Sequence, residues 1–183
     1  DYGQKEPYPD IETDTWIDWN SHCRVWYCAI DTQSYRHFRK LIQENEYDLL
    51  YLNSMFSLRY TIFPLWNSRS LKPEVPILLA PRGMLHAGAL SLKPFKKKLF
   101  LRLLKLTGVY KQIRFQATDA QEVSDIKSVF GSDTEVLSAP NLPKMDQPPL
   151  QTIEKLPGKL KMVFMSRLTA KKGLHLLLEM LID

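Results

Sequence analysis

The chain has 183 residues, of which 44% are apolar, and a formal net charge of +5 at pH 7. A chain of this length can bury one sizeable hydrophobic core, with a further segment beside it. It contains no run of about 18 uncharged apolar residues, so no transmembrane helix is predicted. The first half of the chain is slightly acidic and the second half strongly basic, so we expect the second half to meet an anionic partner.

The first 21 residues are polar, and we expect them to be mostly irregular. They lack the basic and apolar regions of a signal peptide, and we expect the chain to be a piece of a longer protein. A strand is predicted over 24–30. Cys23 and Cys28 lie five positions apart in this region, so their side chains should point to opposite faces. We expect reduced core cysteines of a cytoplasmic protein rather than a disulfide.

From residue 34 onward, helical and strand patterns alternate. Strands are predicted over 47–54, 75–80, 113–118 and 134–140, and helices over 34–46, 57–69 with a kink at Pro64, 94–108 and 119–131. Asp119 should cap the last helix, with Glu122 completing a capping box. Continuously apolar strands that alternate with helices predict an α/β fold: a Rossmann-like, doubly wound parallel sheet covered on both faces.

A proline-rich stretch, "PNLPKMDQPPLQTIEKLPG", follows the last of these strands. Its composition is typical of a linker. We therefore expect a first domain over 1–142, a linker over 143–158 and the start of a second domain over 159–183. The second domain should open with a strand at 160–166, a basic loop and a leucine-rich helix.

Several catalytic motifs are missing. The sequence contains no phosphate-binding G-x-x-x-x-G-K-[ST] loop, no G-x-G-x-x-G, no H-E-x-x-H and no G-x-S-x-G. The four histidines, His22, His37, His86 and His175, form no spaced cluster with the cysteines, so we expect no metal site.

Two loops remain as candidate sites, because open α/β sheets bind ligands at the carboxyl ends of their strands. In "APRGMLHAGAL" (80–90), Arg82 offers a fork suited to phosphate or carboxylate, and Gly83 permits close backbone approach. His86 could accept a proton or bind a sugar hydroxyl. Equally, Arg82 could pair with a structural carboxylate, and His86 could be an ordinary turn residue.

The second loop is "SRLTAKKG" (166–173). Arg167 lies at the predicted strand end and Lys172 near the helix start, so two cations and a helix N-terminus could converge on a diphosphate. The spacing alone fits a solvated basic loop just as well.

The predicted helix 94–107 is basic and amphipathic. Lys98, Arg102 and Lys105 share one face, beside Leu99, Leu103 and Leu106 on the next. Such a helix can lie on an anionic membrane surface, although packing of its leucines on the sheet with its lysines in water is the commoner arrangement. Nucleic-acid binding is not expected, because no basic patch is interleaved with aromatic residues.

Five segments, in order, resemble the bacterial group 1 (family 4) glycosyltransferases, in the branch with a PRG-M/E-L loop. They are "EYDLLYLNSMFS", "PILLAPRGMLHAGALSLKPFKKKLFL", "FQATDAQEVSDI", "APNLP" and "LKMVFMSRLTAKKGLHLLLEML", and the resemblance covers about residues 47–183. It implies a GT-B architecture of two Rossmann-like domains, with the acceptor on the N-terminal domain and the nucleotide-sugar donor on the C-terminal one.

The resemblance also implies roles for particular residues. Arg167 and Lys172 match the family's donor-diphosphate cations, with Gly173 beside them, whereas Lys171 is only a neighbour. Arg82 and Gly83 match the acceptor-side cleft, and His86 stands at a position that varies. Members of the family transfer the sugar with retention of configuration at its anomeric carbon, and generally without a bound metal ion.

The implied function is therefore transfer of a sugar from a UDP- or GDP-sugar to a glycan or lipid-linked acceptor, in the assembly of a cell-surface polysaccharide such as lipopolysaccharide or capsule. The family's first strand with its Gly-rich loop and its downstream pair of glutamates are absent from the sequence, so the fragment itself is expected to be inactive. We expect a cytoplasmic protein with peripheral contact to the inner membrane through 93–111. The alternative is a non-catalytic α/β module that binds phosphate or an anionic surface.

Overall fold

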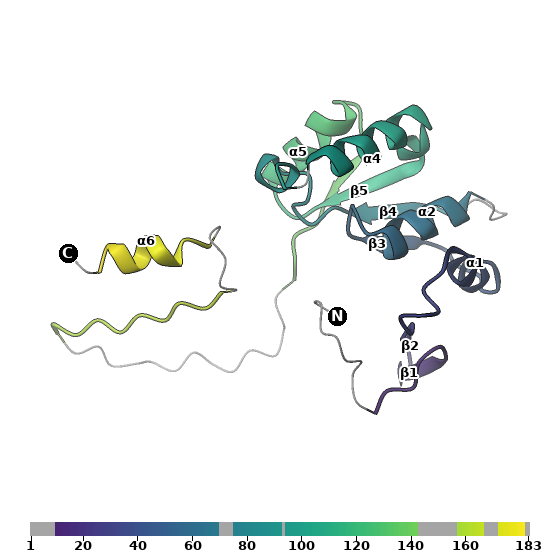
Figure 1. Ribbon diagram of the computed structural model, residues 1–183, viewed down its shortest axis with the longest axis horizontal. Helices are drawn as coiled ribbons and strands as arrows, with labels where there is room; N and C mark the ends of the chain where they lie inside the picture. Colours follow the sequence, from purple (N-terminus) through teal and green to yellow (C-terminus); the bar gives the residue numbers. More distant parts are fainter. Residues whose placement is uncertain (1–9, 70–74, 93, 143–156, 167–171, 182–183) are drawn as a thin grey trace. The chain divides into compact units, whose positions relative to one another are not determined.

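A computed structural model describes residues 10–69, 75–92, 94–142, 157–166 and 172–181 of the chain (Figure 1). The contacts within it divide the chain into two compact units, Asp1–Leu142 and Pro143–Asp183.

The first unit is built on a parallel sheet of four strands. These are β3 (Leu50–Asn53), β4 (Ile77–Ala80), β5 (Ile113–Ala117) and β6 (Val136–Ser138), which lie side by side in that order. Each falls within a segment predicted as a strand, so the parallel α/β organisation of this part of the chain is confirmed.

The four helices predicted for this unit are formed, and the described residues contain two further short helical turns where none was predicted. The helical elements are α1 (Tyr35–Gln43), a π-helical turn η1 (Leu58–Ile62), α2 (Phe63–Ser68), α3 (Ala87–Leu90), α4 (Pro94–Leu106), a 3-10 turn η2 (Val109–Gln112) and α5 (Ala120–Phe130). The two turns that were not predicted are α3 and η2. Pro64 lies in the first turn of α2, a position at which proline is tolerated. The kink predicted at Pro64 falls beside the change from π-helix to α-helix.

The core lies on one face of the sheet. Leu52, Leu79 and Phe115 point to this face and are at most 3% exposed. Completely buried side chains from α2, α4 and α5 belong to the same cluster: Leu65, Leu104 and Ile126. Figure 1 shows α4 and α5 on the same side of the strands. Residues of the alternate register, such as Tyr51 and Leu137, are exposed.

The one-sided core follows from the strand order. Crossovers between parallel strands are almost always right-handed, so strands added in one direction, from β3 to β6, place every connecting helix on the same face. A doubly wound sheet needs a reversal of strand order. The described residues contain no such reversal and show connecting helices on one face, so the covering of both faces remains a prediction.

The N-terminal segment forms a separate hairpin. Strands β1 (Trp16–Asn20) and β2 (Cys23–Trp26) pair antiparallel. The strand predicted over 24–30 is thus formed only in part, and in a hairpin rather than in the parallel sheet. The start predicted as mostly irregular contains β1, and its residues 1–9 lie outside the described residues. The turn is favoured because the Asn20 side chain accepts a hydrogen bond from the His22 N–H at 2.9 Å.

The cysteines of this region are free, but they are not core residues. Cys23 is exposed and Cys28 half-buried. The predicted burial fails because the hairpin is not part of the parallel sheet, and a two-stranded hairpin has little interior.

The second unit contains helix α6 (Leu174–Glu179), in agreement with the predicted leucine-rich helix. The strand predicted over 160–166 is not formed. These residues have no regular structure and are exposed, for example Val163 at 85%. A strand needs a neighbour for its backbone hydrogen bonds, and none of the other described residues of this unit forms one.

Candidate functional site

A strained turn follows the carboxyl end of strand β4. The Met84 N–H donates to the Pro81 carbonyl at 3.2 Å, and the two central residues, Arg82 and Gly83, have φ angles of 55° and 70°. Two successive positive φ angles occur in type I′ turns, where glycine and asparagine are preferred. An arginine in this conformation costs of order 1 kcal/mol, and such strain concentrates at functional sites.

The turn places the Arg82 guanidinium across the sheet edge. Its Nε donates to Asn53 Oδ1 at 2.7 Å, one terminal nitrogen to the Tyr51 hydroxyl at 2.8 Å, and the other to Asn141 Oδ1. Tyr51 in turn donates to Gln116 Oε1 at 2.7 Å. The network thus joins residues of β3 and β5 and residues that follow β4 and β6.

The charge of Arg82 has no counter-ion among the residues that the structure describes, because all its hydrogen-bond partners are neutral oxygens. The sequence left open a pairing with a structural carboxylate, and the described residues do not provide one. A guanidinium has five N–H groups, so those not used by the three oxygens remain for a ligand. An exposed, positioned and unneutralised cation of this kind suits phosphate or carboxylate.

The Glu122 side chain fixes Gly83, the second central residue of the turn. Its carboxylate is 4% exposed and accepts from the Gly83 N–H at 2.6 Å and from the Thr118 N–H and hydroxyl, each at 2.8 Å. Asp119 caps α5 as predicted, by accepting from the Glu122 N–H at 2.8 Å. The predicted capping box is only half formed, because the Glu122 carboxylate bonds to Thr118 rather than to the backbone of Asp119.

His86 has a local structural role. Its Nδ1 accepts from the Gly88 N–H at 3.2 Å and so caps the single-turn helix α3. Its side chain makes no hydrogen bond to the Arg82 network. The interpretation of His86 as a turn residue therefore accounts for its contacts.

The donor-loop residues are described only in part. Arg167 and Lys171 lie outside the described residues. Lys172 is exposed, and Gly173 precedes α6 with a φ of 69°. The convergence of Arg167 and Lys172 on a diphosphate remains a prediction.

Helix α4 departs from the commoner arrangement, in which the leucines beside its cations pack on the sheet. It packs on the core through Leu101 and Leu104, whereas Leu99 and Leu103 are each 48% exposed and Leu106 is 73% exposed. The expectation that these three leucines pack on the sheet is wrong. With Phe95 at 79% exposure, they form an outward apolar stripe flanked by the exposed cations Lys98, Arg102 and Lys105. We call these seven residues the α4 surface.

A hollow of about 660 Å³ lies at the opposite, amino-terminal edge of β5 and β6. Arg114 and Glu135, which line it, form an ion pair at 3.1 Å. Because ligands of open α/β sheets bind at carboxyl ends, and because its cation is already neutralised, this hollow is a weaker candidate than the Arg82 network.

Sequence reasoning found Arg82 and Gly83 but missed the residues that position them. Tyr51, Asn53, Gln116 and Asn141 are polar residues at or just beyond the carboxyl ends of predicted strands. That position was the available signal, since the ends of parallel strands meet at one edge of the sheet.

Comparison of the chain with protein-family models, with curated proteins and with solved structures gives no match. None of the described helices is both long and apolar enough to span a bilayer.

Proposed function

We propose that this chain is the acceptor-side domain, together with the start of the donor domain, of a retaining glycosyltransferase, which moves a sugar from a UDP- or GDP-sugar to a glycan or lipid-linked acceptor in cell-surface polysaccharide assembly. The proposal rests on the sequence resemblance and on one observation. Arg82 is a cation that has no counter-ion among the described residues and is fixed by three neutral oxygens at the carboxyl edge of a parallel sheet.

On the acceptor side, Arg82 binds a phosphate of a lipid-linked acceptor or a sugar hydroxyl through its remaining N–H groups. The Tyr51, Asn53 and Asn141 oxygens fix the guanidinium before the ligand arrives, so little side-chain entropy is lost on binding. Tyr51 is itself oriented by Gln116.

On the donor side, Arg167 and Lys172 bind the diphosphate, with Gly173 beside them. Negative charge grows on the diphosphate as its bond to the anomeric carbon breaks, and fixed cations stabilise that charge. The acceptor hydroxyl attacks from the same face, which retains the anomeric configuration, and the leaving phosphate accepts its proton. In this scheme no side-chain nucleophile and no metal takes part in the transfer.

The test measures transfer from radiolabelled UDP- and GDP-sugars to lipid-linked glycan by the complete gene product that contains these residues. Arg167→Ala and Lys172→Ala should each lower kcat about 100-fold, since one lost stabilising donor costs about 10² to 10³. Lys171→Ala is the matched control and should retain activity. Arg82→Ala should chiefly raise the KM for the acceptor. Full activity in both donor-loop variants would refute the proposal.

A second candidate function is binding to an anionic membrane surface, which the α4 surface favours. Its apolar stripe points away from the core and is flanked by cations, as in helices that lie in the interface of a bilayer. Lys97 is directed elsewhere, because its ammonium donates to the Ala89 carbonyl and lies 5.3 Å from the Phe56 ring centroid.

Co-sedimentation with vesicles tests this function. The chain should bind phosphatidylglycerol vesicles more tightly than phosphatidylcholine vesicles, and salt should weaken the binding. Leu103→Ser and Arg102→Glu should each reduce it. Lys127→Glu makes the same charge change on α5, outside the α4 surface, and should have little effect. Equal binding by the Arg102 and Lys127 variants would argue against a specific role for α4.

A further inference from the structure

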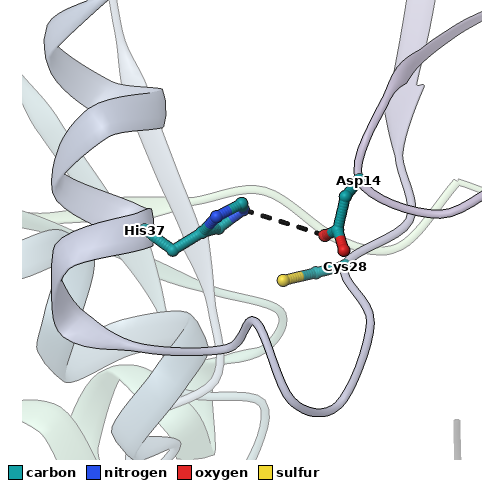
Figure 2. Close-up of side chains that lie close together, drawn as sticks. All are labelled: Asp14, Cys28 and His37. Atoms are coloured by element: carbon teal, nitrogen blue, oxygen red, sulfur yellow. Dashed lines mark ion pairs between the residues drawn. The ribbon is translucent and has the colours of Figure 1, made fainter.

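Three side chains from separate segments converge beside the N-terminal hairpin. Asp14 precedes strand β1, Cys28 follows strand β2, and His37 belongs to helix α1. Figure 2 shows them directed into one space between the helix and the loops that flank the hairpin. Their potential ligand atoms all lie within 4.8 Å of one another, and all three residues are half-buried.

His37 has an unsatisfied nitrogen in this space. Its Nε2 is fully buried and has no hydrogen-bond partner in the part of the chain that the structure describes. The Asp14 Oδ1 lies 3.9 Å from it, which is too far for a hydrogen bond. A buried polar atom without a partner costs the folded state about 1–3 kcal/mol. A ligand bonded to His37 Nε2 would remove this cost.

The other two ligand atoms are held by Thr32. Its hydroxyl donates to Asp14 Oδ1 at 2.8 Å and lies 3.6 Å from the Cys28 sulfur. The Ala29 N–H also donates to Asp14 Oδ1, at 3.3 Å. Asp14 itself has a φ of 59°, a left-handed conformation that is uncommon outside glycine. The carboxylate is therefore fixed in place by its neighbours.

A cysteine, a histidine and an aspartate could also form a nucleophilic triad, but two observations argue against it. No hydrogen bond joins Cys28 to His37 among the described residues, and the imidazole Nε2 faces Asp14 instead. Burial raises the pKa of the Cys28 thiol above its ordinary value, which opposes the thiolate that a metal-free nucleophile requires, whereas a bound zinc ion itself deprotonates a thiol ligand.

We propose that Asp14, Cys28 and His37 form a zinc-binding site that fastens the hairpin to helix α1. The donor set of one sulfur, one imidazole nitrogen and one carboxylate oxygen is suited to Zn²⁺ and not to Mg²⁺ or Ca²⁺. The carboxylate and the bound thiolate together balance the ion's charge. Water occupies the fourth position.

The geometry allows such an ion. With zinc bonds of about 2.0 to 2.3 Å, the ligand atoms of a tetrahedral site lie roughly 3.3 to 3.7 Å apart. The observed separations of at most 4.8 Å therefore close with movements of about 1 Å in side chains that are already directed inward.

The proposed role follows from the hairpin's weak interior. Neither strand has a fully buried residue, and an isolated two-stranded hairpin is marginal in water. One ion bound by residues on both sides of the hairpin and by α1 would stabilise their attachment. This role is independent of sugar transfer.

The test uses the full chain, loaded with zinc and passed through gel filtration before its metal content is measured. We expect one zinc per chain, and on Co²⁺ substitution a thiolate-to-metal charge-transfer band with the visible bands of a tetrahedral site. Cys28→Ser and His37→Gln should each weaken zinc binding by about 100-fold or more, since even outer-shell changes cost about 10- to 100-fold. Thr32→Val should weaken it by about 10-fold.

The hairpin supplies matched controls, because His22 and Cys23 are exposed on it. His22→Gln and Cys23→Ser should bind zinc as the unmodified chain does. Zinc should also raise the unfolding temperature of the unmodified chain and not that of His37→Gln. Absence of retained zinc, undiminished binding by the Cys28 and His37 variants, or loss of binding in the two controls would overturn the proposal.

Discussion

Glu122 is a buried carboxylate that serves the candidate site without a ligand-binding role of its own. It accepts hydrogen bonds from Gly83 and from Thr118, and so connects the Arg82 turn to the start of α5. No cation pairs with it among the described residues. Hydrogen bonds from these three N–H and O–H groups therefore offset the free-energy cost of burying the carboxylate.

We predict that Glu122→Gln lowers the free energy of unfolding by about 1–3 kcal/mol, because the new amide N–H group faces backbone donors that then lack an acceptor. Urea denaturation measures this change. Glu135→Gln, on an exposed carboxylate, is the control and should change stability by about 0.5 kcal/mol or less. Equal losses in the two variants would contradict the role assigned to Glu122.

Tyr47 predicts a pH dependence of stability. Burial raises the pKa of its phenol above the ordinary value, against weaker opposing effects of Arg24 and Asn45. Its hydroxyl donates to the Leu41 carbonyl at 3.0 Å. The folded state favours the neutral phenol of Tyr47 more than the unfolded state does, so the neutral form stabilises the fold. This stabilisation is complete below pH about 10 and is lost as the pH rises through the folded-state pKa.

The free energy of unfolding of the unmodified chain should therefore fall above pH about 10, and Tyr47→Phe should fall less steeply. Burial also raises the pKa of Tyr60, so the variant keeps part of the slope. Denaturation in urea across this pH range is the measurement. Identical slopes in the two proteins would show that Tyr47 ionises equally well in both states.

At the scale of elements, strand β4 offers a direct test of the one-sided sheet. Leu79 is completely buried on the core face, and its neighbour Leu78 is half-buried on the other face. Leu79→Ala should cost about 2–5 kcal/mol, and Leu78→Ala clearly less, as measured by chemical denaturation. A comparable loss from both would mean that a further layer covers the second face.

The sequence was sufficient to predict the alternating strands and helices between Leu50 and Ser138, because apolar runs and the Asp119 cap are local signals. It could not predict which face they cover, since that depends on strand order. The predicted strand at 160–166 shows the same limit. Its composition favours a strand, but composition does not supply the partner strand that its hydrogen bonds need.

Both candidate sites contain contacts that the spacing of residues in the sequence could not predict. Arg82 was found because it follows a predicted strand, whereas its acceptor Asn141 lies 59 positions away. Cys28 and His37 were set aside as metal ligands because their spacing matches no zinc motif, yet the fold brings both to Asp14. Contacts between residues that lie far apart in the sequence depend on tertiary structure, which local sequence patterns do not predict.

At the scale of the whole molecule, the buried core cluster extends from Leu52 to Phe130 and so lies within the first unit. We predict that a chain of residues 1–142 unfolds with the same free energy and the same denaturant dependence as the 183-residue chain, because both quantities follow the apolar surface buried on folding. Leu79→Ala should also cost the same in both lengths. A shorter chain that is less stable by more than about 1 kcal/mol would mean that residues 143–183 contribute to the fold of the first unit, since differences of that size exceed the usual scatter of additive effects.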